Sequence, residues 1–283
     1  MTFKVLAKIA IVFSTMYCAC ASSAETLQEI LASQSGHVQA RYSARHPQQT
    51  LEFFGLKPGM TVIEALPGRG WYSNILMPLL GPKGQLIGAD YAFDMYPKFN
   101  FYSEDYLAAK STWGKTWTES VLRRHGNEVA KVGAFAFGSM TDDVHGKVDI
   151  VLLIRALHNL ARFEGDGGYL STALGEIHRA LKPGGAVGVV QHLAPEDAPD
   201  DWADGNNGYL KKSFVIKAVT DAGFELVDES DVNLNPADQP VVGDIVWRLP
   251  PSLATSREDP ELRTRLQDIG ESTRMTLLFR KNN

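Results

Sequence analysis

The chain from position 62 to 72 is Val62-Ile63-Glu64-Ala65-Leu66-Pro67-Gly68-Arg69-Gly70-Trp71-Tyr72. An apolar run leads to an acid, the chain turns through proline and glycine, and a segment with helical spacing follows. A strand, a glycine-rich loop and a helix in this order form the crossing at which α/β proteins bind nucleotide-like cofactors. The two glycines let backbone approach a ligand closely. The stretch therefore predicts a cofactor loop, in which Glu64 can accept a hydrogen bond from a ligand amine or hydroxyl.

Strands and helices alternate along the rest of the chain. Further strands are expected at 85–89, 132–137, 148–154, 186–191, 224–227 and 273–279, and helices at 25–34, 47–54, 75–80, 170–181 and 214–222. Such alternation predicts an α/β fold with a mostly parallel sheet and right-handed crossovers. No internal repeat is present, and residues 25–283 read as one domain that begins with a helical extension, 25–59.

Asp90 ends the second expected strand, about twenty residues after the loop, where an acid can bind both hydroxyls of a cofactor ribose. The alternative is an aspartate that caps a helix or a turn. The residues that follow, 94–126, are rich in aromatic side chains and read as an irregular insertion. Either this insertion covers the site, or it is a surface excursion whose aromatic residues fill a minor cluster.

The first residues resemble an export signal. Lys4 and Lys8 accompany an apolar run to Tyr17, and Ser22-Ser23-Ala24 offers a cleavage pattern, which predicts a signal peptide over 1–24 and an exported, periplasmic protein. An uncleaved anchor is the alternative, although the run is short for a spanning helix. Both cysteines, Cys18 and Cys20, lie in this segment, and acylation of one of them would make a lipoprotein. The mature chain then has no thiol for disulfides, metal ligation or nucleophilic catalysis.

Several classes of function find no support in the residues. The net charge of −5 and the lack of a Lys/Arg cluster argue against nucleic acid as a partner. The histidines lack metal-ligand spacing, so no metal site is expected. No Gly-x-Ser-x-Gly elbow and no phosphate-binding Gly-Lys-Ser/Thr loop is present, which removes serine hydrolases and nucleoside triphosphatases. A small-molecule partner is the remaining expectation.

The motifs resemble the class I S-adenosylmethionine-dependent methyltransferases, and within them a group of exported bacterial "predicted methyltransferases". The resemblance covers the chain from about Arg41 to its end. It rests on these motifs: His46-Pro47, Phe53-Phe54-Gly55-Leu56-Lys57-Pro58-Gly59, Glu64 with Pro67-Gly68-x-Gly70-Trp71-Tyr72, Leu157-His158-Asn159-Leu160, Leu181-Lys182-Pro183-Gly184-Gly185, Ala222-Gly223-Phe224 and Asn235-Pro236-Ala237-Asp238.

The resemblance implies a Rossmann-like, seven-stranded sheet with an antiparallel last strand, helices on both faces, and S-adenosylmethionine across the strand ends. It implies that Glu64, Gly68 and Gly70 line the methionine and ribose side and that Asp90 binds the ribose hydroxyls. Ser139 and Met140 would then flank the adenine.

Arg155 and His158 follow the fourth strand and, by the same resemblance, face the methyl-donor pocket. Methyl transfer needs mainly alignment, so few reactive side chains are required. His158 is the candidate general base for an acceptor. The alternative is a histidine that only hydrogen-bonds the adjacent backbone. His192, which follows the fifth strand, is a second candidate, for which a structural role is favoured.

One departure from the common methyltransferase loop is informative. Leu66 stands where that loop has its first glycine, and Pro67 removes a backbone donor. This departure, together with the export signal, motivates a second hypothesis, a non-catalytic exported protein that binds a ligand or a partner with a methyltransferase-like fold. A nicotinamide dehydrogenase is a third hypothesis, which the glycine spacing does not favour.

Overall fold

The computed structural model describes residues 25–126 and 129–282. The expected signal peptide, 1–24, lies outside the described residues. Within the described ranges, no helix is both long and apolar enough to cross a membrane.

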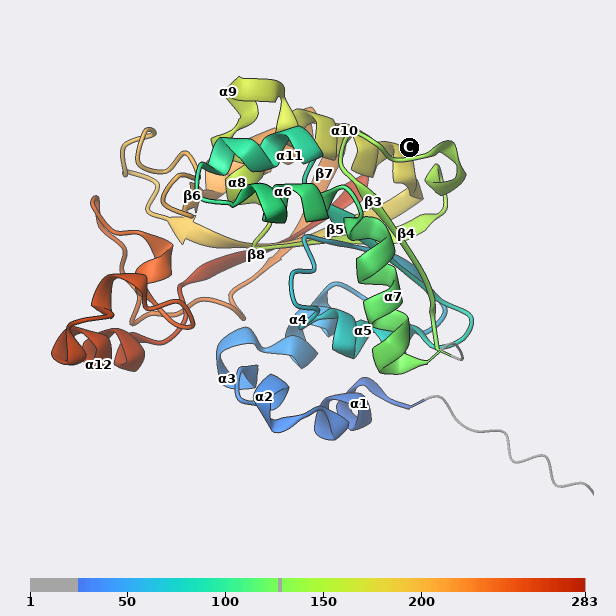
Figure 1. Ribbon diagram of the computed structural model, residues 1–283, viewed down its shortest axis with the longest axis horizontal. Coiled ribbons are helices and arrows are strands. Elements are labelled where there is room, and N and C mark those ends of the chain that lie inside the picture. Colours follow the sequence, from blue (N-terminus) through green and yellow to red (C-terminus); the bar gives the residue numbers. More distant parts are fainter. Residues whose placement is uncertain (1–24, 127–128, 283) are drawn as a thin grey trace, which may run out of the picture.

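A twisted open sheet forms the centre of the molecule (Figure 1). Its strands are β1 (Thr61–Ala65), β2 (Gln85–Asp90), β3 (Lys131–Ala136), β4 (Val148–Ile154), β5 (Leu181–Ala194), β6 (Leu210–Lys211), β7 (Phe224–Ser230) and β8 (Arg274–Lys281). The order is β3-β2-β1-β4-β5-β8-β7, and the short β6 pairs with the end of β5. β8 is antiparallel to both β5 and β7, whereas the other pairs are parallel. The predicted mostly parallel sheet with an antiparallel last strand is confirmed, and β6 is an addition to the seven expected strands.

Helices cover both faces of the sheet. The helices of the described residues are α1 (Leu27–Ser33), α2 (Gly36–Gln39), α3 (Tyr42–Arg45), α4 (Pro47–Phe53), α5 (Ser73–Leu80), α6 (Glu104–Lys110), α7 (Trp113–His125), α8 (Leu157–Arg162), α9 (Glu164–Gly167), α10 (Tyr169–Ala180), α11 (Lys212–Asp221) and α12 (Pro260–Ile269), of which α12 lies away from the sheet. Short 3-10 helices are η1 (Phe93–Phe99), η2 (Asp142–Val144), η3 (Val246–Arg248) and η4 (Ala254–Ser256). One face carries α8, α10 and α11, and the other carries α1, α4, α5 and α7 (Figure 1).

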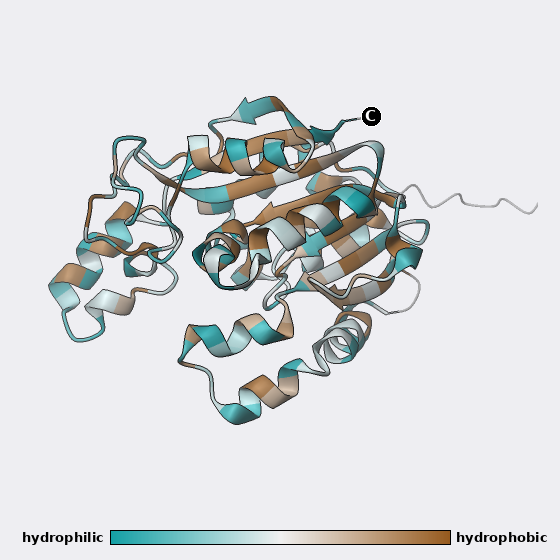
Figure 2. Ribbon diagram, turned by 90° about the horizontal axis from the view of Figure 1, so that it is seen from above, coloured by the Kyte–Doolittle hydropathy of each residue, from teal (hydrophilic) through white to brown (hydrophobic). Residues whose placement is uncertain are grey.

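The core is divided by the sheet into two apolar layers. β4 is buried on both of its faces and contributes to each layer, as expected for a central parallel strand. Figure 2 shows the hydrophobic strands enclosed between helices whose outer surfaces are more polar. Burial of these two layers holds the carboxyl ends of the parallel strands along one edge, which is where such sheets bind ligands.

Two glycines inside strands let helices pack very close to the sheet. A Cβ atom on Gly88 of β2 would lie 2.8 Å from the Trp117 ring of α7, and one on Gly188 of β5 would lie 2.8 Å from the Phe54 ring, directly after α4. Both distances are too short for carbon atoms, so neither position accepts a larger residue without movement. The aromatic rings of Trp117 and Phe54 therefore pack directly on glycines of the sheet, and these contacts position α7 and α4.

The prediction of an irregular segment at 94–126 is wrong, because most of it is helical. Ser103 caps α6 by accepting a hydrogen bond from the Tyr106 N–H, and Trp117 and Val121 bury one side of α7 against the sheet. The aromatic and β-branched residues of α7 have low helix propensity, and its packing on the sheet supplies the missing stability. The residues of α6 are mostly good helix formers and follow the Ser103 cap, so its helix has a local signal that the sequence analysis missed.

The fifth strand also begins earlier than predicted. It starts at Leu181 instead of Ala186, and the pairing with β4 shifts between Val148 and Ile150. Gly184, with φ 69°, lies in the stretch of β5 opposite this irregularity. Four residues of β5, 182–185, thus lie opposite the single Asp149 and interrupt the pairing, and continuous pairing with β4 starts at Ala186, where the strand was predicted to begin.

The close approach of α7 to β2 can be tested by replacing Gly88 with alanine. We expect Gly88→Ala to lower the free energy of unfolding by about 1–3 kcal/mol, because Trp117 must move or the strand must shift. Urea denaturation followed by tryptophan fluorescence measures the change.

Gly133→Ala in the neighbouring β3 is the matched control, since its Cβ would have its nearest contact at 3.7 Å. This variant should stay within about 0.5 kcal/mol of the unmodified protein. Equal stability of the two variants would contradict the packing of α7 on β2.

Candidate functional site

The loop after β1 is strained at the residue that departs from the common pattern. Leu66 has φ 52°, in the left-handed region that glycine adopts without cost, and Gly68 and Gly70 have φ 55° and 78°. The Leu66 N–H donates to the Ala89 carbonyl of β2 at 2.7 Å, which fixes the residue in this conformation. Leu66 therefore has a backbone conformation that favours glycine, at a cost on the order of 1–3 kcal/mol.

Glu64 lies beneath this loop and is only 5% exposed. Its Oε2 accepts a hydrogen bond of 2.6 Å from the hydroxyl of Ser73, the first residue of α5. Burial raises the pKa of Glu64 to about 7, and the Ser73 hydrogen bonds oppose that rise. At neutral pH this carboxyl group is therefore divided between its protonated and ionised forms.

Asp90 ends β2 with its carboxylate engaged on both oxygens. Oδ1 accepts from the Tyr96 hydroxyl at 2.6 Å and from the Tyr91 N–H at 3.0 Å, while Oδ2 accepts from the Lys110 ammonium at 2.7 Å. Asp90 is not the N-cap of the following 3-10 helix, which is Ala92. The side chain therefore faces partners that come from the 94–126 segment.

A pocket of about 490 Å³ adjoins this carboxylate. Its lining combines the loop after β1, the end of β2 and the helices α6 and α7, and comprises Leu66, Gly68, Arg69, Asp90, Tyr91, Tyr96, Tyr102, Tyr106, Ala109, Lys110, Trp113 and Thr116. Gly70 does not line it. A Cβ atom on Gly70 would lie 2.9 Å from the guanidinium nitrogens of Arg124 in α7, so this glycine leaves room for that side chain.

Aromatic rings surround the Lys110 ammonium. The nitrogen lies 4.3 Å from the ring centroid of Tyr96, 5.5 Å from that of Tyr106 and 5.8 Å from that of Trp113. The Lys110 ammonium is thus stabilised both by cation–π attraction to these rings and by the Asp90 carboxylate. The carboxylate and the electron-rich rings of the pocket therefore already hold one cation of the chain, and Arg69 adds a second positive charge to the lining.

The two residues predicted beside an adenine follow β3. Ser139 lines a second pocket of about 410 Å³ that also contains Ala92 and Phe93, which follow the Asp90 strand. Met140 does not line this pocket, and its N–H donates to Glu176 at 3.1 Å. The second pocket extends along the edge of the sheet from β2 toward β3.

His158 and His192 form a buried pair, with ring centroids 5.5 Å apart. His158 Nδ1 lies 3.3 Å from Gln191 Oε1, an atom that can only accept, so this contact places the proton on Nδ1 and leaves Nε2 as the basic nitrogen. Burial lowers the pKa of His158 to about 4. His192 contacts the Ser272 hydroxyl at 2.6 Å, and burial followed by the nearby His158 lowers its pKa as well.

Arg155 does not line the Asp90 pocket. It follows β4 with φ 57° and lies in an electrostatic cluster with arginines at both ends of the sequence, Arg41, Arg45 and Arg274, and with Glu271. The edge of the sheet thus carries two chemically different regions. Asp90 and aromatic rings lie on the β2 side, and arginines and histidines lie beyond β4.

These residues fit S-adenosylmethionine in part. The Asp90 carboxylate at the end of β2 and the open Cα of Gly68 lie in one pocket, as a ribose and its neighbouring chain require. Lys110 holds one of the two carboxylate oxygens. A ribose would have to share that oxygen with the lysine or displace it.

Two groups of residues in the site escaped the sequence predictions. The first group is the set of aromatic rings around Lys110, those of Tyr96, Tyr106 and Trp113. The sequence indicated it only by the aromatic content of the 94–126 segment. The cluster of Arg41, Arg45 and Arg274 around Glu271 joins residues about 230 positions apart. No local pattern indicates such a contact.

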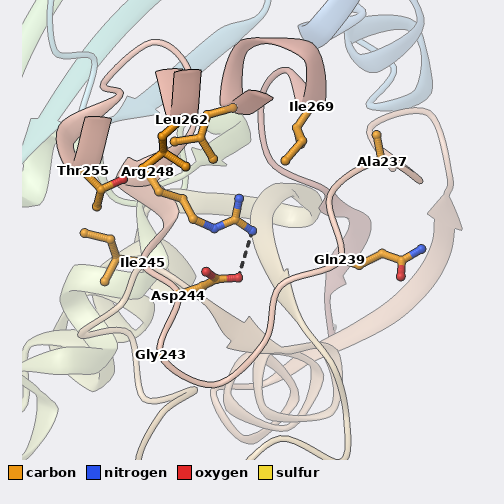
Figure 3. A pocket seen from close by; sticks show the side chains of 10 residues that line it. Ala237, Gln239, Gly243, Asp244, Ile245, Arg248, Thr255, Leu262 and Ile269 are labelled. Atoms are coloured by element: carbon orange, nitrogen blue, oxygen red, sulfur yellow. Dashed lines mark ion pairs between the residues drawn. The ribbon is translucent and has the colours of Figure 1, made fainter. Parts of the chain in front are cut away.

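A cavity of about 620 Å³ lies elsewhere, between the 237–248 segment and α12. Figure 3 shows Arg248 directed at Asp244 inside it, at 3.1 Å, and Arg248 also pairs with Asp238 at 2.8 Å. Two carboxylates compensate this guanidinium, and the remaining lining is mostly apolar. None of the predicted site residues lines this cavity.

No family model and no curated protein matches the chain. Solved structures do match it. The geranyl diphosphate C-methyltransferase from Streptomyces coelicolor A3(2), in complex with Mg²⁺, geranyl diphosphate and S-adenosyl-L-homocysteine, is 13% identical, with a TM-score of 0.52 over 93% of this chain and 86% of that one. A geranyl diphosphate methyltransferase in complex with SAM is 14% identical, with a TM-score of 0.51 over 90% of each chain.

At these identities the likeness concerns the fold and extends over nearly the whole chain. The strand order and the antiparallel β8 agree with the fold that the sequence motifs implied. This protein has the α/β, Rossmann-like fold of S-adenosylmethionine-dependent methyltransferases.

Proposed function

We propose that this protein is an S-adenosylmethionine-dependent methyltransferase that acts on a small-molecule or cell-envelope acceptor. The observation that carries the proposal is the Asp90 carboxylate in one pocket with the glycine loop of β1. The proposal includes membership of the exported group of predicted methyltransferases and cleavage near Ala24 into the periplasm. It also treats residues 25–283 as one domain in which 94–126 covers the cofactor site.

The residues have distinct roles in this proposal. Asp90 accepts hydrogen bonds from the ribose hydroxyls, Gly68 and Leu66 border the chain beyond the ribose, and Ser139 borders the adenine. When bound, S-adenosylmethionine supplies an activated methyl group on a sulfonium, and transfer needs mainly alignment of acceptor, methyl and sulfur. Glu64, Gly70 and Met140 support the loops that carry these contacts.

His158 is the proposed proton acceptor for the methyl acceptor. It is neutral at physiological pH, because its pKa is about 4, and Nε2 is the nitrogen free to take a proton. Its low basicity makes it a weak base, so the proposal gives it a modest share of the catalysis.

A second candidate function is a non-catalytic binding protein with the same fold. The contact between the Lys110 ammonium and the Asp90 carboxylate favours it, because a residue of the chain itself holds the group assigned to the ribose. The two candidates differ in one measurable respect. A methyltransferase must bind S-adenosylmethionine and S-adenosylhomocysteine, whereas the second candidate need not.

Calorimetry on the mature protein tests the role of Asp90. We expect both cofactor forms to bind, and Asp90→Ala to weaken binding by about tenfold to a hundredfold, because hydrogen bonds from the ribose to a charged acceptor are lost. Methyl transfer to a cell-envelope extract should disappear with the same substitution. Absence of binding at millimolar cofactor would refute the methyltransferase.

Lys110→Met is the matched variant, because it breaks the ion pair between Lys110 and Asp90 by removing the ammonium. The Asp90 carboxylate then remains available to the ribose. We expect cofactor binding to this variant to stay equal or to become a few times tighter. If Lys110→Met weakened binding as much as Asp90→Ala, the ion pair would matter for the shape of the pocket, and the ribose assignment of Asp90 would fail.

The pH dependence of cofactor affinity tests Glu64. Its pKa of about 7 in the free protein should fall when the ammonium of the cofactor binds nearby, since a cation favours the ionised carboxylate. Binding then releases the proton that Glu64 holds below its pKa. Affinity should therefore fall about tenfold between about pH 8 and about pH 6.

Glu64→Gln removes the titrating group and keeps the acceptor for Ser73. Calorimetry on both proteins across the same range separates the Glu64 contribution from titration of the cofactor itself. The variant should show the smaller slope. Identical slopes would exclude an electrostatic effect of Glu64 on the charged part of the cofactor.

A further inference from the structure

Four arginines from distant parts of the chain lie at the edge of the sheet beyond β4. Arg41 precedes α3 and Arg45 ends it, Arg155 follows β4, and Arg274 begins β8. The side chains of Arg45 and Arg274 are 5% and 4% exposed, and that of Arg41 is 21% exposed. In this arginine cluster, Arg45 and Arg274 are thus removed from water, whereas Arg41 and Arg155 have intermediate exposure.

One carboxylate balances the cluster. Glu271, 7% exposed, accepts hydrogen bonds from Arg41 Nε at 2.8 Å, from Arg45 Nε at 3.3 Å and from Arg274 Nη1 at 3.4 Å. Across residues 25–126 and 129–282, no other carboxylate lies within ion-pair distance of these arginines. A buried excess of positive charge is costly unless further negative charge compensates it.

The structure shows that cost. Burial lowers the pKa of Arg45 to about 10, and the nearby Arg155 lowers it further against the opposing effect of Glu271. Arg45 gains some stabilisation from the Trp71 ring, whose centroid lies 4.6 Å from its guanidinium carbon. The cluster therefore has a deficit of negative charge in the protein alone.

Arg155 is the arginine of the cluster whose guanidinium has no hydrogen-bond partner among the described residues. The guanidinium groups of Arg41, Arg45 and Arg274 each make at least one hydrogen bond. Its backbone is held at φ 57° by a 2.6 Å hydrogen bond from its N–H to the Val190 carbonyl. A non-glycine residue in this conformation is strained, and strain of this kind is concentrated at ligand sites.

Space is present next to the cluster. Glu271 and Arg274 line a cavity of about 250 Å³ together with Ser43, His46 and Asn235. The Nδ1 atom of His46 is buried without a hydrogen-bond partner among the described residues. The cavity is smaller than a typical pocket for a complete ligand. Arg274 is the arginine that lines it, whereas Arg155 does not line it and has a side chain of intermediate exposure directly after β4.

We propose that the arginine cluster binds an anionic group, a carboxylate or phosphate, of the methyl acceptor, with Arg155 as the contacting arginine. This inference rests on the proposed function. Guanidinium groups present paired donors that match the oxygens of carboxylates and phosphates. The acceptor class is therefore anionic small molecules, held at the end of β4 opposite the carboxylate pocket of β2.

A carboxylate can reach the cluster from two sources, the acceptor and the methionine part of the cofactor. Calorimetric titration with acetate, phosphate and pyrophosphate distinguishes them when it is done both without and with saturating S-adenosylhomocysteine. We expect affinity to rise with the charge of the anion and to persist in the presence of S-adenosylhomocysteine. Competition between the two ligands would assign the arginines to the cofactor and overturn the acceptor assignment.

Arg155→Gln is the test variant, since it breaks no hydrogen bond of the folded protein. It should weaken pyrophosphate binding by about tenfold or more and leave the affinity for S-adenosylhomocysteine unchanged. Arg179→Gln, on the exposed side of α10, makes the same change in net charge and should bind pyrophosphate as the unmodified protein does. Equal binding by the unmodified protein and Arg155→Gln, or no pyrophosphate binding at millimolar concentration, would overturn the proposal.

Urea denaturation of the anion-free proteins gives a second measurement. A binding role predicts that Arg155→Gln unfolds at the same or a higher urea concentration, because one uncompensated positive charge has been removed. A structural role predicts a lower concentration and would count against the proposal. If the protein binds pyrophosphate but not S-adenosylhomocysteine, the arginine cluster is an anion site but the protein is not a methyltransferase. The assignment of the anion to a methyl acceptor would then be overturned.

Discussion

The parallel pairing of β1 with β2 and β4 is the constraint on which the site depends. It brings the ends of three strands to one edge, so that the loop after β1, the acid after β2 and the arginine after β4 become neighbours. At two of these ends the chain turns through a non-glycine residue with positive φ, Leu66 and Arg155. Each is held there by a backbone hydrogen bond to an adjacent strand, to Ala89 or to Val190. The sheet thus determines both where the site lies and where the backbone is strained.

Charge is distributed unevenly along this edge. On the β2 side, the Asp90 carboxylate and several tyrosine rings hold the Lys110 ammonium, and Arg69 also lines the pocket. A cationic ligand would bind there in place of Lys110. Beyond β4 the arginines exceed the single carboxylate of Glu271, which favours an anion. A cationic methyl donor that displaced Lys110 and an anionic acceptor would then occupy opposite halves of the edge. Such an arrangement orients two ligands without any reactive side chain, which suits a reaction limited by alignment.

The sequence predicted the central elements well because their signals are local. β1, β2 and β4 are compact apolar runs bounded by turn residues, and the glycines after β1 mark the crossing that leads to α5. Asp90 could be placed because it directly follows a recognisable strand. Within 94–126, α7 is difficult to predict because its aromatic and β-branched residues have low helix propensity and are stabilised by packing on the sheet. By contrast, α6 was missed although the Ser103 cap and the residues after it favour a helix. The first residues of β5 were missed because 182–185 have the composition of a turn and interrupt its pairing with β4.

The polar part of the site was beyond prediction for a different reason. Lys110 meets Asp90 across twenty positions, and Arg41 meets Glu271 across 230, so only the folded sheet brings these charges together. The same burial that gathers them also changes their chemistry. It makes Glu64 easier to protonate and makes His158 a weaker base. An acceptor that must first lose a proton would therefore find little help from His158. The site as built suits an acceptor whose nucleophilic atom carries a lone pair at neutral pH and whose negative charge, elsewhere in the molecule, is held by the arginines.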